Sequence, residues 1–370
     1  MTRRPVLAAV ASAAVLLVLA IPALSLKFGD GALRQFPKDN ETRVGSELAA
    51  RQLGAGSSGP AQVLASFDHG TASDPGNRQA LTAYVKRLRS DREVAAVASP
   101  RVSRDRRAAL IVAQPRHDPE SPQAGALVKR LRQDADAGVS SLARRADVNV
   151  GGATAAVTDF KDLVSGSMWK ILLFVLAFSY LVLLVLLRSA ILPLKAVLMN
   201  LLSVAAAYGV LVAVFQYGWL DGLTGYHSLG YINTMTPPFL LAIVFGLSMD
   251  YEVFLLSRIR ERYDATGDTK RAVAEGLRGS ARTISSAALI MVTVFAVFAF
   301  TGVPSIKEIG LGLAVAIALD ATLVRLILVP ATMEIMGRWN WWLPRPLARV
   351  LPRAAFEASG RHAGRAAAGA

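Results

Sequence analysis

The chain is 370 residues long, 53% hydrophobic and only 18% charged, and it carries a formal net charge of +14. Soluble domains contain roughly 25% charged residues, so this composition argues against an ordinary soluble protein and predicts a membrane protein. The absence of cysteine excludes disulfide frameworks, thiol nucleophiles and thiolate metal sites. Lysine and arginine gather at the ends of apolar segments, where topology and anionic lipids favour them, so no nucleic-acid partner is predicted.

The first apolar segment runs from Pro5 to Leu26 after a short basic start. Two interpretations stay open. The small residues at 23–25 fit the cleavage site of a signal peptide. The apolar run, however, exceeds the roughly 7–15 residues of a signal-peptide core, which favours a retained transmembrane helix over residues 1–26.

Residues 27–166 are polar and soluble in character. Their apolar spacing predicts strands and helices in the order βαββαβ, the ferredoxin-like split unit. The predicted strands cover residues 62–67, 93–98, 107–113 and 147–150, and the predicted helices cover residues 77–89 and 123–136. One such layer exposes a sheet face, so we expect a partner for that face. The Gly- and Ser-rich residues 54–60 predict a flexible joint.

Five further apolar segments are long enough to cross a membrane. They cover residues 168–187, 196–215, 237–262, 285–301 and 309–330, which gives six predicted transmembrane helices in all. The predicted domains are a first helix (1–26), an α+β domain (27–166), a five-helix bundle (167–335) and a C-terminal segment (336–370). Trp339, Trp341 and Trp342 lie among arginines and predict an interfacial segment, whereas the Ala- and Gly-rich tail beyond Ala354 is predicted to be disordered.

Two connecting segments predict the orientation. Residues 216–236 contain no lysine or arginine and several aromatic residues, Tyr226 among them, which is typical of an outer loop. Residues 258–282, read as a loop, hold seven basic residues, which places them in the cytoplasm. Both termini are therefore predicted to be cytoplasmic, and residues 27–166 extracytoplasmic.

The helix predicted between Pro237 and Arg262 carries Asp250 and Glu252 beside Tyr251. An acid near the middle of a bilayer costs about 2.5–3.5 kcal/mol on insertion scales, so it marks an ion path or a bonded interior position. The alternative is a helix next to the interface, with its acids paired to the basic residues that follow: Arg258, Arg260 and Arg262.

On this helix Gly246, Asp250 and Ser257 share one face. Gly246 is expected to let a neighbouring helix pack over the acid, and Tyr251 to offer its hydroxyl to an acid on that neighbour. A carboxyl group in this position can bind and release a proton as access alternates, driven by the membrane potential. Glu252 is expected to face the bundle or the inner edge, and Ser257 is a further intramembrane polar candidate.

In the last span Gly312, Ala316 and Asp320 fall four residues apart on one face, where small residues allow close helix packing. For Asp320, near mid-membrane, a structural hydrogen bond and a role in a proton relay stay equally open. Arg325 follows five residues later and, in an α-helix, is rotated away. We therefore expect no direct salt bridge between them, with Arg325 extending to the interface.

The signature helix of the MMPL family of resistance-nodulation-division (RND) transporters is similar to one stretch here, FGLSMDYEVFLLSRIRE. Other stretches extend the resemblance over nearly the whole chain, among them GGATAAVTDF and LDATLVRLILVPA, and match the second half of such a transporter. The resemblance implies an α-helical membrane protein with an extracytoplasmic porter domain between helices 1 and 2. It also implies that Asp250 and Tyr251 form the proton relay, and that the proton gradient drives export of lipid or other hydrophobic molecules across the bacterial inner membrane without a cofactor.

Family members resemble two tandem halves, whereas no internal repeat is found here. A homodimer or a separately encoded first half is therefore an expected partner, beside membrane lipids and the hydrophobic substrate. The alternative function is a non-transporting accessory subunit, which includes a truncated remnant, a partner-binding scaffold and a relative of the SecD and SecF pair. No nucleophile–base pair or metal-ligand cluster is found, and His69 and His117 are isolated, so we predict no enzyme activity and no metal site.

Overall fold

The computed structural model describes residues 4–29, 31, 35–37, 39–221 and 228–351. The chain divides into two compact units. One, called the helical unit below, contains residues 1–28 and 167–370, and the other, the α+β unit, contains residues 29–166. The predictions for Tyr226 and for the tail beyond Ala354 concern residues outside the described ranges.

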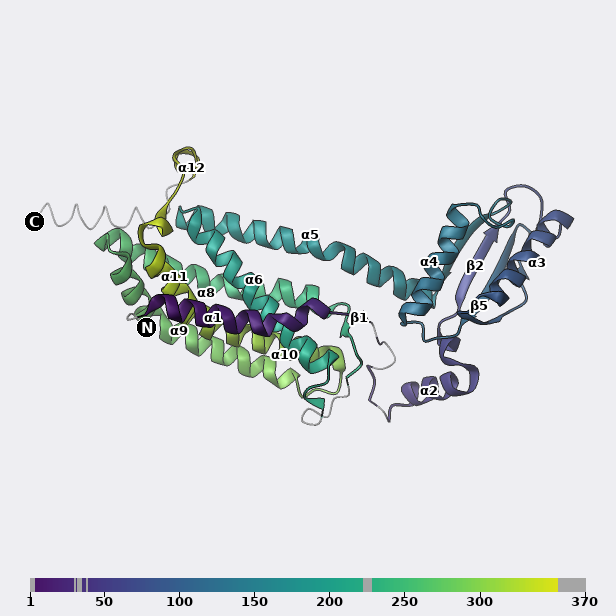
Figure 1. Cartoon of the computed structure of the whole chain (residues 1–370), viewed down its shortest axis with the longest axis horizontal. Coiled ribbons are helices and arrows are strands. Elements are labelled where there is room, and N and C mark those ends of the chain that lie inside the picture. The colour runs from purple at the N-terminus through teal and green to yellow at the C-terminus, as the bar shows by residue number, and fades with distance from the viewer. Residues whose placement is uncertain (1–3, 30, 32–34, 38, 222–227, 352–370) are drawn as a thin grey trace, which may run out of the picture. The chain divides into compact units, whose positions relative to one another are not determined.

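Six helices in the described ranges are long and apolar enough to cross a membrane, as the sequence predicted (Figure 1). The first combines α1 (Pro5–Ala20) with the 3₁₀ turn η1 (Ile21–Ser25). The next four are α5 (Ala153–Leu187), α6 (Ile191–Leu211) with its π-helical end η3 (Val212–Gln216), α8 (Thr236–Thr266) and α9 (Thr269–Phe298). The last joins α10 (Pro304–Leu319), the π-helical η4 (Asp320–Leu328), α11 (Val329–Met336) and η5 (Gly337–Trp341), and is followed by α12 (Arg345–Val350).

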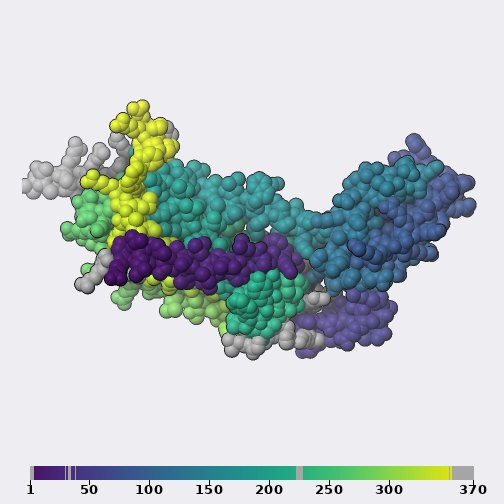
Figure 2. Space-filling model, in the orientation of Figure 1, coloured from purple at the N-terminus to yellow at the C-terminus, as the bar shows by residue number. Residues whose placement is uncertain are grey.

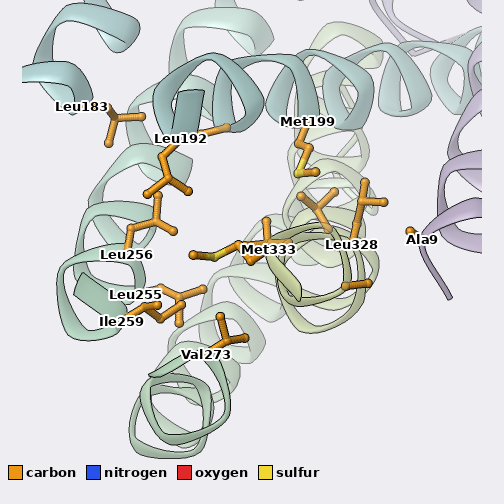
Figure 3. Packing of buried hydrophobic residues seen from close by; sticks show 14 of the residues in the cluster. Ala9, Leu183, Leu192, Met199, Leu255, Leu256, Ile259, Val273, Leu328 and Met333 are labelled. Atoms are coloured by element: carbon orange, nitrogen blue, oxygen red, sulfur yellow. The ribbon is translucent and has the colours of Figure 1, made fainter. Parts of the chain in front are cut away.

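Apolar side chains from several helices meet in the core of the helical unit (Figure 3). Leu192 of α6, Leu255 and Ile259 of α8 and Met333 of α11 belong to one buried cluster. Helix α1 packs along α6, and Figure 2 shows it, in purple, across the near face of the unit.

The predicted loop at residues 258–282 is helical. Helix α8 continues to Thr266, where Gly267 takes a left-handed φ of 67°. Asp268 then caps α9 by accepting a hydrogen bond from the Lys270 amide. The prediction was wrong because only the apolar run ends near residue 262, whereas the helix itself continues through basic residues.

The α+β unit contains the βαββαβ order that the sequence predicted. Strand β2 (Ala61–Ser66) pairs antiparallel with β5 (Ala108–Pro115) and β6 (Asp147–Gly152), and β5 also pairs with β3 (Val94–Val97) and β4 (Arg101–Val102). The strand order β3–β5–β2–β6 is that of the ferredoxin-like unit. Helices α3 (Pro75–Ser90) and α4 (Pro122–Asp136) form its connections, and α5 begins directly after β6 rather than at residue 168.

Both connecting helices pack on one face of this sheet. Ile111 of β5 is fully buried with Leu81 of α3 and Leu127 of α4 in a second core. On the other face of β2, Leu64 is 43% exposed. The α+β unit by itself therefore leaves one sheet face uncovered.

Residues 54–60 do not form a flexible joint. They follow a helix that the sequence analysis missed, α2 (Glu41–Leu53), and they contain the 3₁₀ turn η2 (Ala55–Ser58). Gly56 is buried, and a Cβ there would overlap the Pro115 carbonyl oxygen. Glycine occurs at this position because two backbone segments approach closely. The Gly- and Ser-rich composition was therefore not a sign of a flexible joint.

We predict that Gly209→Ala destabilises the helical unit by about 1–3 kcal/mol, the usual cost of overpacking. A Cβ at Gly209 would overlap the Leu19 carbonyl oxygen, so α1 would have to move away from α6. Gly246→Ala is the matched control, because a Cβ there meets open space within the chain. Thermal unfolding of the purified chain in micelles measures both, and equal midpoints would contradict the predicted contact.

Candidate functional site: a buried ionic cluster

Several buried polar side chains of the helical unit converge on Asp320, at the start of η4. Asp320 is 1% exposed, and its Oδ2 atom accepts hydrogen bonds from Ser248 Oγ at 2.7 Å and from Tyr251 OH at 2.8 Å. Arg325 Nε donates a third hydrogen bond to the same oxygen at 3.1 Å. We call Asp320, Arg325, Ser248, Tyr251, Glu252 and Asn200 the ionic cluster.

The Asp320–Arg325 ion pair corrects the sequence prediction. That prediction assumed an α-helix, in which residues five apart point in different directions. Residues 320–328 instead form the π-helix η4, whose i→i+5 repeat brings Asp320 and Arg325 to the same side. Arg325 is consequently buried in the protein at 1% exposure rather than extended to the interface.

Arg325 is held by groups from α8 as well as by Asp320. Its Nη2 atom donates to the Ser248 carbonyl oxygen at 2.5 Å and to Ser248 Oγ at 2.8 Å. The guanidinium also lies 4.0 Å from the centre of the Tyr251 ring. A buried guanidinium stays charged and needs such partners, because removing it from water costs several kcal/mol.

Glu252 supplies the second carboxyl group of the ionic cluster, from the face of α8 that also carries Ser248. It is 3% exposed, its Oε2 lies 3.8 Å from Arg325 Nη2, and it accepts a hydrogen bond from Asn200 Nδ2 at 2.7 Å. Ser248 Oγ, 3.3 Å from Asn200 Oδ1, lies between the two acids. Two carboxyl groups therefore face one guanidinium.

One carboxylate oxygen of Asp320 is buried without a partner. Its Oδ1 atom has no hydrogen-bond partner among the described residues. A buried carboxylate oxygen without a donor is costly, so this oxygen distinguishes Asp320 from the other groups of the ionic cluster.

The predicted relay residues lie on different faces of α8. Tyr251 joins the ionic cluster, whereas Asp250 and Gly246 are exposed on the surface of the chain. Ser257 lies outside the cluster, and its hydroxyl donates to the Phe254 carbonyl oxygen of its own helix. Among the described residues no neighbour packs over Gly246, and its role in helix packing stays a prediction.

The predicted packing positions of the last span do pack closely. A Cβ at Gly312 would overlap the Leu240 side chain, and Ala316 is fully buried beside Ser203, whose hydroxyl lies 3.4 Å from the Ala316 carbonyl oxygen. These small residues bring α10 against α6 and α8, which positions Asp320 next to Ser248.

The basic residues that end α8 do not neutralise its intramembrane acids. They pair instead with acids near the helix ends, Arg258 with Glu261, Arg260 with Asp264 and Arg262 with Glu275. The alternative of a helix whose acids pair with these arginines is therefore wrong for Glu252, which belongs to the ionic cluster, and Asp250 has no such partner among the described residues.

Sequence analysis missed Ser248 and Asn200 as cluster members. Asn200 is a polar residue inside an otherwise apolar span, and Ser248 precedes Tyr251 and Glu252 by one helical turn. Both signals were available, but the stripe chosen for α8 was the exposed one. Among the described residues, no group of three or more His, Cys, Asp or Glu side chains converges as a metal site requires.

These features define a multi-pass membrane protein with a charged site inside its helical bundle. The MMPL family pattern matches residues 34–367, and the chain belongs to the MMPL family.

The chain is 50% identical over 355 residues to the heme uptake protein MmpL11 of Mycobacterium tuberculosis, covering 96% of this chain and 36% of that protein. It is 46% identical over 356 residues to the mycolic acid-containing lipids exporter MmpL11 of Mycolicibacterium smegmatis, covering 96% of this chain and 37% of that protein. Against the membrane protein YdfJ of Bacillus subtilis the identity is 32%, covering 96% of this chain and 48% of that protein. The chain thus spans about a third of the length of the MmpL11 relatives.

We predict that Arg325→Met destabilises the helical unit by about 3–5 kcal/mol, because it leaves two buried carboxyl groups without their cation. Adding Asp320→Asn to this variant should restore part of the loss. Arg258→Met, at an exposed ion pair with Glu261, is the control and should change stability by less than about 1 kcal/mol. Unfolding midpoints in micelles measure all three, and equal effects of the two Arg→Met changes would contradict the burial argument.

Proposed function

We propose that the chain is half of a proton-driven exporter of lipids or other hydrophobic molecules. The observation that supports it best is the ionic cluster, in which two carboxyl groups share one guanidinium inside a membrane span. In this proposal one of the two carboxyl groups changes its protonation state while the other stays paired with Arg325. Membership of the MMPL family and the relatives named as transport proteins agree with export.

In this proposal the proton reaches Asp320 through Tyr251, whose hydroxyl gives its own proton to Oδ2 and takes up another in its place. The Tyr251 hydroxyl already contacts Asp320, and its ring covers Arg325. When Asp320 is protonated, Arg325 is left with Glu252 as its ionised partner, 3.8 Å away in the structure. Movement of the guanidinium between the two acids would couple proton binding to a shift of η4 against α8.

Asp250 completes the relay from a second half. An exposed aspartate in a lipid-facing helix costs about 2.5–3.5 kcal/mol, so a partner is expected to cover it. A second copy of the chain would bring its own Asp250 to this face, and a separately encoded first half would bring its own polar groups, as parallel repeats allow. In the proposed orientation both termini are cytoplasmic and the α+β unit is the extracytoplasmic porter domain.

A non-transporting accessory subunit is the second candidate. The complete Asp320–Arg325 pair within one chain favours it, because such a pair also serves to hold helices in register. The two candidates differ in the role of the Tyr251 hydroxyl. In the exporter it carries protons, whereas in the accessory subunit it contributes only to stability.

We predict that vesicles containing the chain move an NBD-labelled phospholipid between leaflets faster under an imposed pH gradient. Asp320→Asn and Tyr251→Phe should reduce the rate to that of protein-free vesicles, because each removes a proton-carrying group while keeping the side-chain shape. Quenching by dithionite measures the rate. Thr293→Val is the control, since this hydroxyl bonds only the Leu289 carbonyl oxygen of its own helix. Gradient-dependent movement that survives both variants would refute the relay, and an absence of gradient-dependent movement with the unaltered chain would favour the accessory role.

We also predict that the exposed face of α8 pairs with a second copy. The chain contains no cysteine, so a single Gly246→Cys variant reports this contact without background. Mild oxidation in membranes should give a covalent dimer on denaturing gels. Leu289→Cys, 68% exposed on α9, is the control and should stay monomeric. A monomer in both cases would contradict self-pairing and leave a separately encoded half as the expected partner.

A further inference from the structure

A groove in the α+β unit separates α3 from the strand β4 and the residues just before it. Its volume is about 600 Å³, within the range of roughly 300–1,000 Å³ typical of small-molecule sites. All of its lining residues belong to the α+β unit, so the groove is complete without any contribution from the helical unit.

The floor of the groove is apolar. Leu81 and Val85 line it from the buried face of α3, and Pro100 and Val102 line it from the opposite side. Val102 is 47% exposed although it is a large aliphatic residue, so its side chain offers apolar surface that the α+β unit itself does not cover.

The rim of the groove is cationic. Arg78, Lys86 and Arg89 project from α3 along one side, together with the hydroxyl groups of Ser73 and Thr82, and no acidic residue lines the groove. None of the three cations forms an ion pair with a described residue. The acids nearest in sequence are engaged elsewhere: Asp74 accepts hydrogen bonds from the amide and hydroxyl of Thr71, and Asp91 binds Arg130.

The other basic residues of α3 and α4 are paired. Arg87, on another side of α3, binds Asp134, while on α4 Lys129 binds Asp162, Arg130 binds Asp91 and Arg132 binds Asp159. On these two helices, the cations without an ion pair to a described residue are therefore the three that line the groove. This combination of charge and apolar surface fits a ligand with an anionic end and a hydrocarbon body.

We propose that this groove binds an anionic amphiphile, with its hydrocarbon chain on Leu81, Val85 and Val102 and its carboxylate or phosphate at Lys86 and Arg89. No aromatic side chain lines the groove, so the stacking surface that single-stranded nucleic acids use is absent from it. As a site for the exported molecule it rests on the proposed function, but binding itself requires no proton gradient.

Photo-cross-linking of the full-length chain in phosphatidylcholine nanodiscs tests the site. The probe is palmitic acid with a diazirine in its chain, and labelled peptides are mapped by mass spectrometry. We expect labelling of residues in α3 and β4 that excess palmitate suppresses and hexadecanol does not. Lys86→Glu should lower this labelling about fivefold, through one lost attraction and one new repulsion at an exposed site.

Arg144→Glu is the matched control, because it makes the same charge change at an exposed side chain that contacts only loop carbonyl groups outside the groove. Val102→Asn, at an exposed position, should also lower labelling without affecting the fold. The proposal is overturned if Lys86→Glu and Arg144→Glu label equally, if hexadecanol competes as well as palmitate, or if the groove stays unlabelled. Labelling of the groove without gradient-driven lipid movement would keep the site and refute the exporter.

Discussion

The structure of the helical unit depends on how one buried guanidinium is balanced. Arg325 lies inside a membrane span, where an unpaired cation would be prohibitively costly. Its partners come from two elements. Asp320 lies in its own π-helical segment, and the Ser248 carbonyl oxygen and the Tyr251 ring belong to α8. Close packing at Gly312 and Ala316 keeps these elements together, so the small residues and the charged ones serve the same arrangement.

Helix α8 presents two chemically different faces. The inner face carries Ser248 and Glu252, both in the ionic cluster, and the outer face carries Asp250, which has no partner among the described residues. The two acids of α8 thus lie in different surroundings although only Tyr251 separates them in the sequence.

Sequence reasoning recovered the coarse architecture because it rests on strong, local signals. The apolar runs predicted the six spans, and the alternation of apolar residues predicted the βαββαβ order. The predicted ends of those strands lie within two residues of the ends in the structure. It failed where geometry departs from regular helices. The Asp320–Arg325 pair was missed because a π-helix changes the angular spacing of side chains. Helix α2 was missed because it is short and none of its residues is buried, so its apolar pattern is weak. On α8 both faces contain an acid, so the sequence pattern alone does not tell which face lies inside the bundle.

The π-helical segment ties the charge balance to the exact number of residues in η4. Adding or deleting one residue between Asp320 and Arg325 would rotate Arg325 by roughly a quarter of a turn around the helix axis. Every side-chain type would remain, yet the guanidinium would face away from Ser248 and Glu252. Length in this segment is therefore under tighter constraint than composition, and natural variation there should appear as exchanged residues rather than as insertions or gaps.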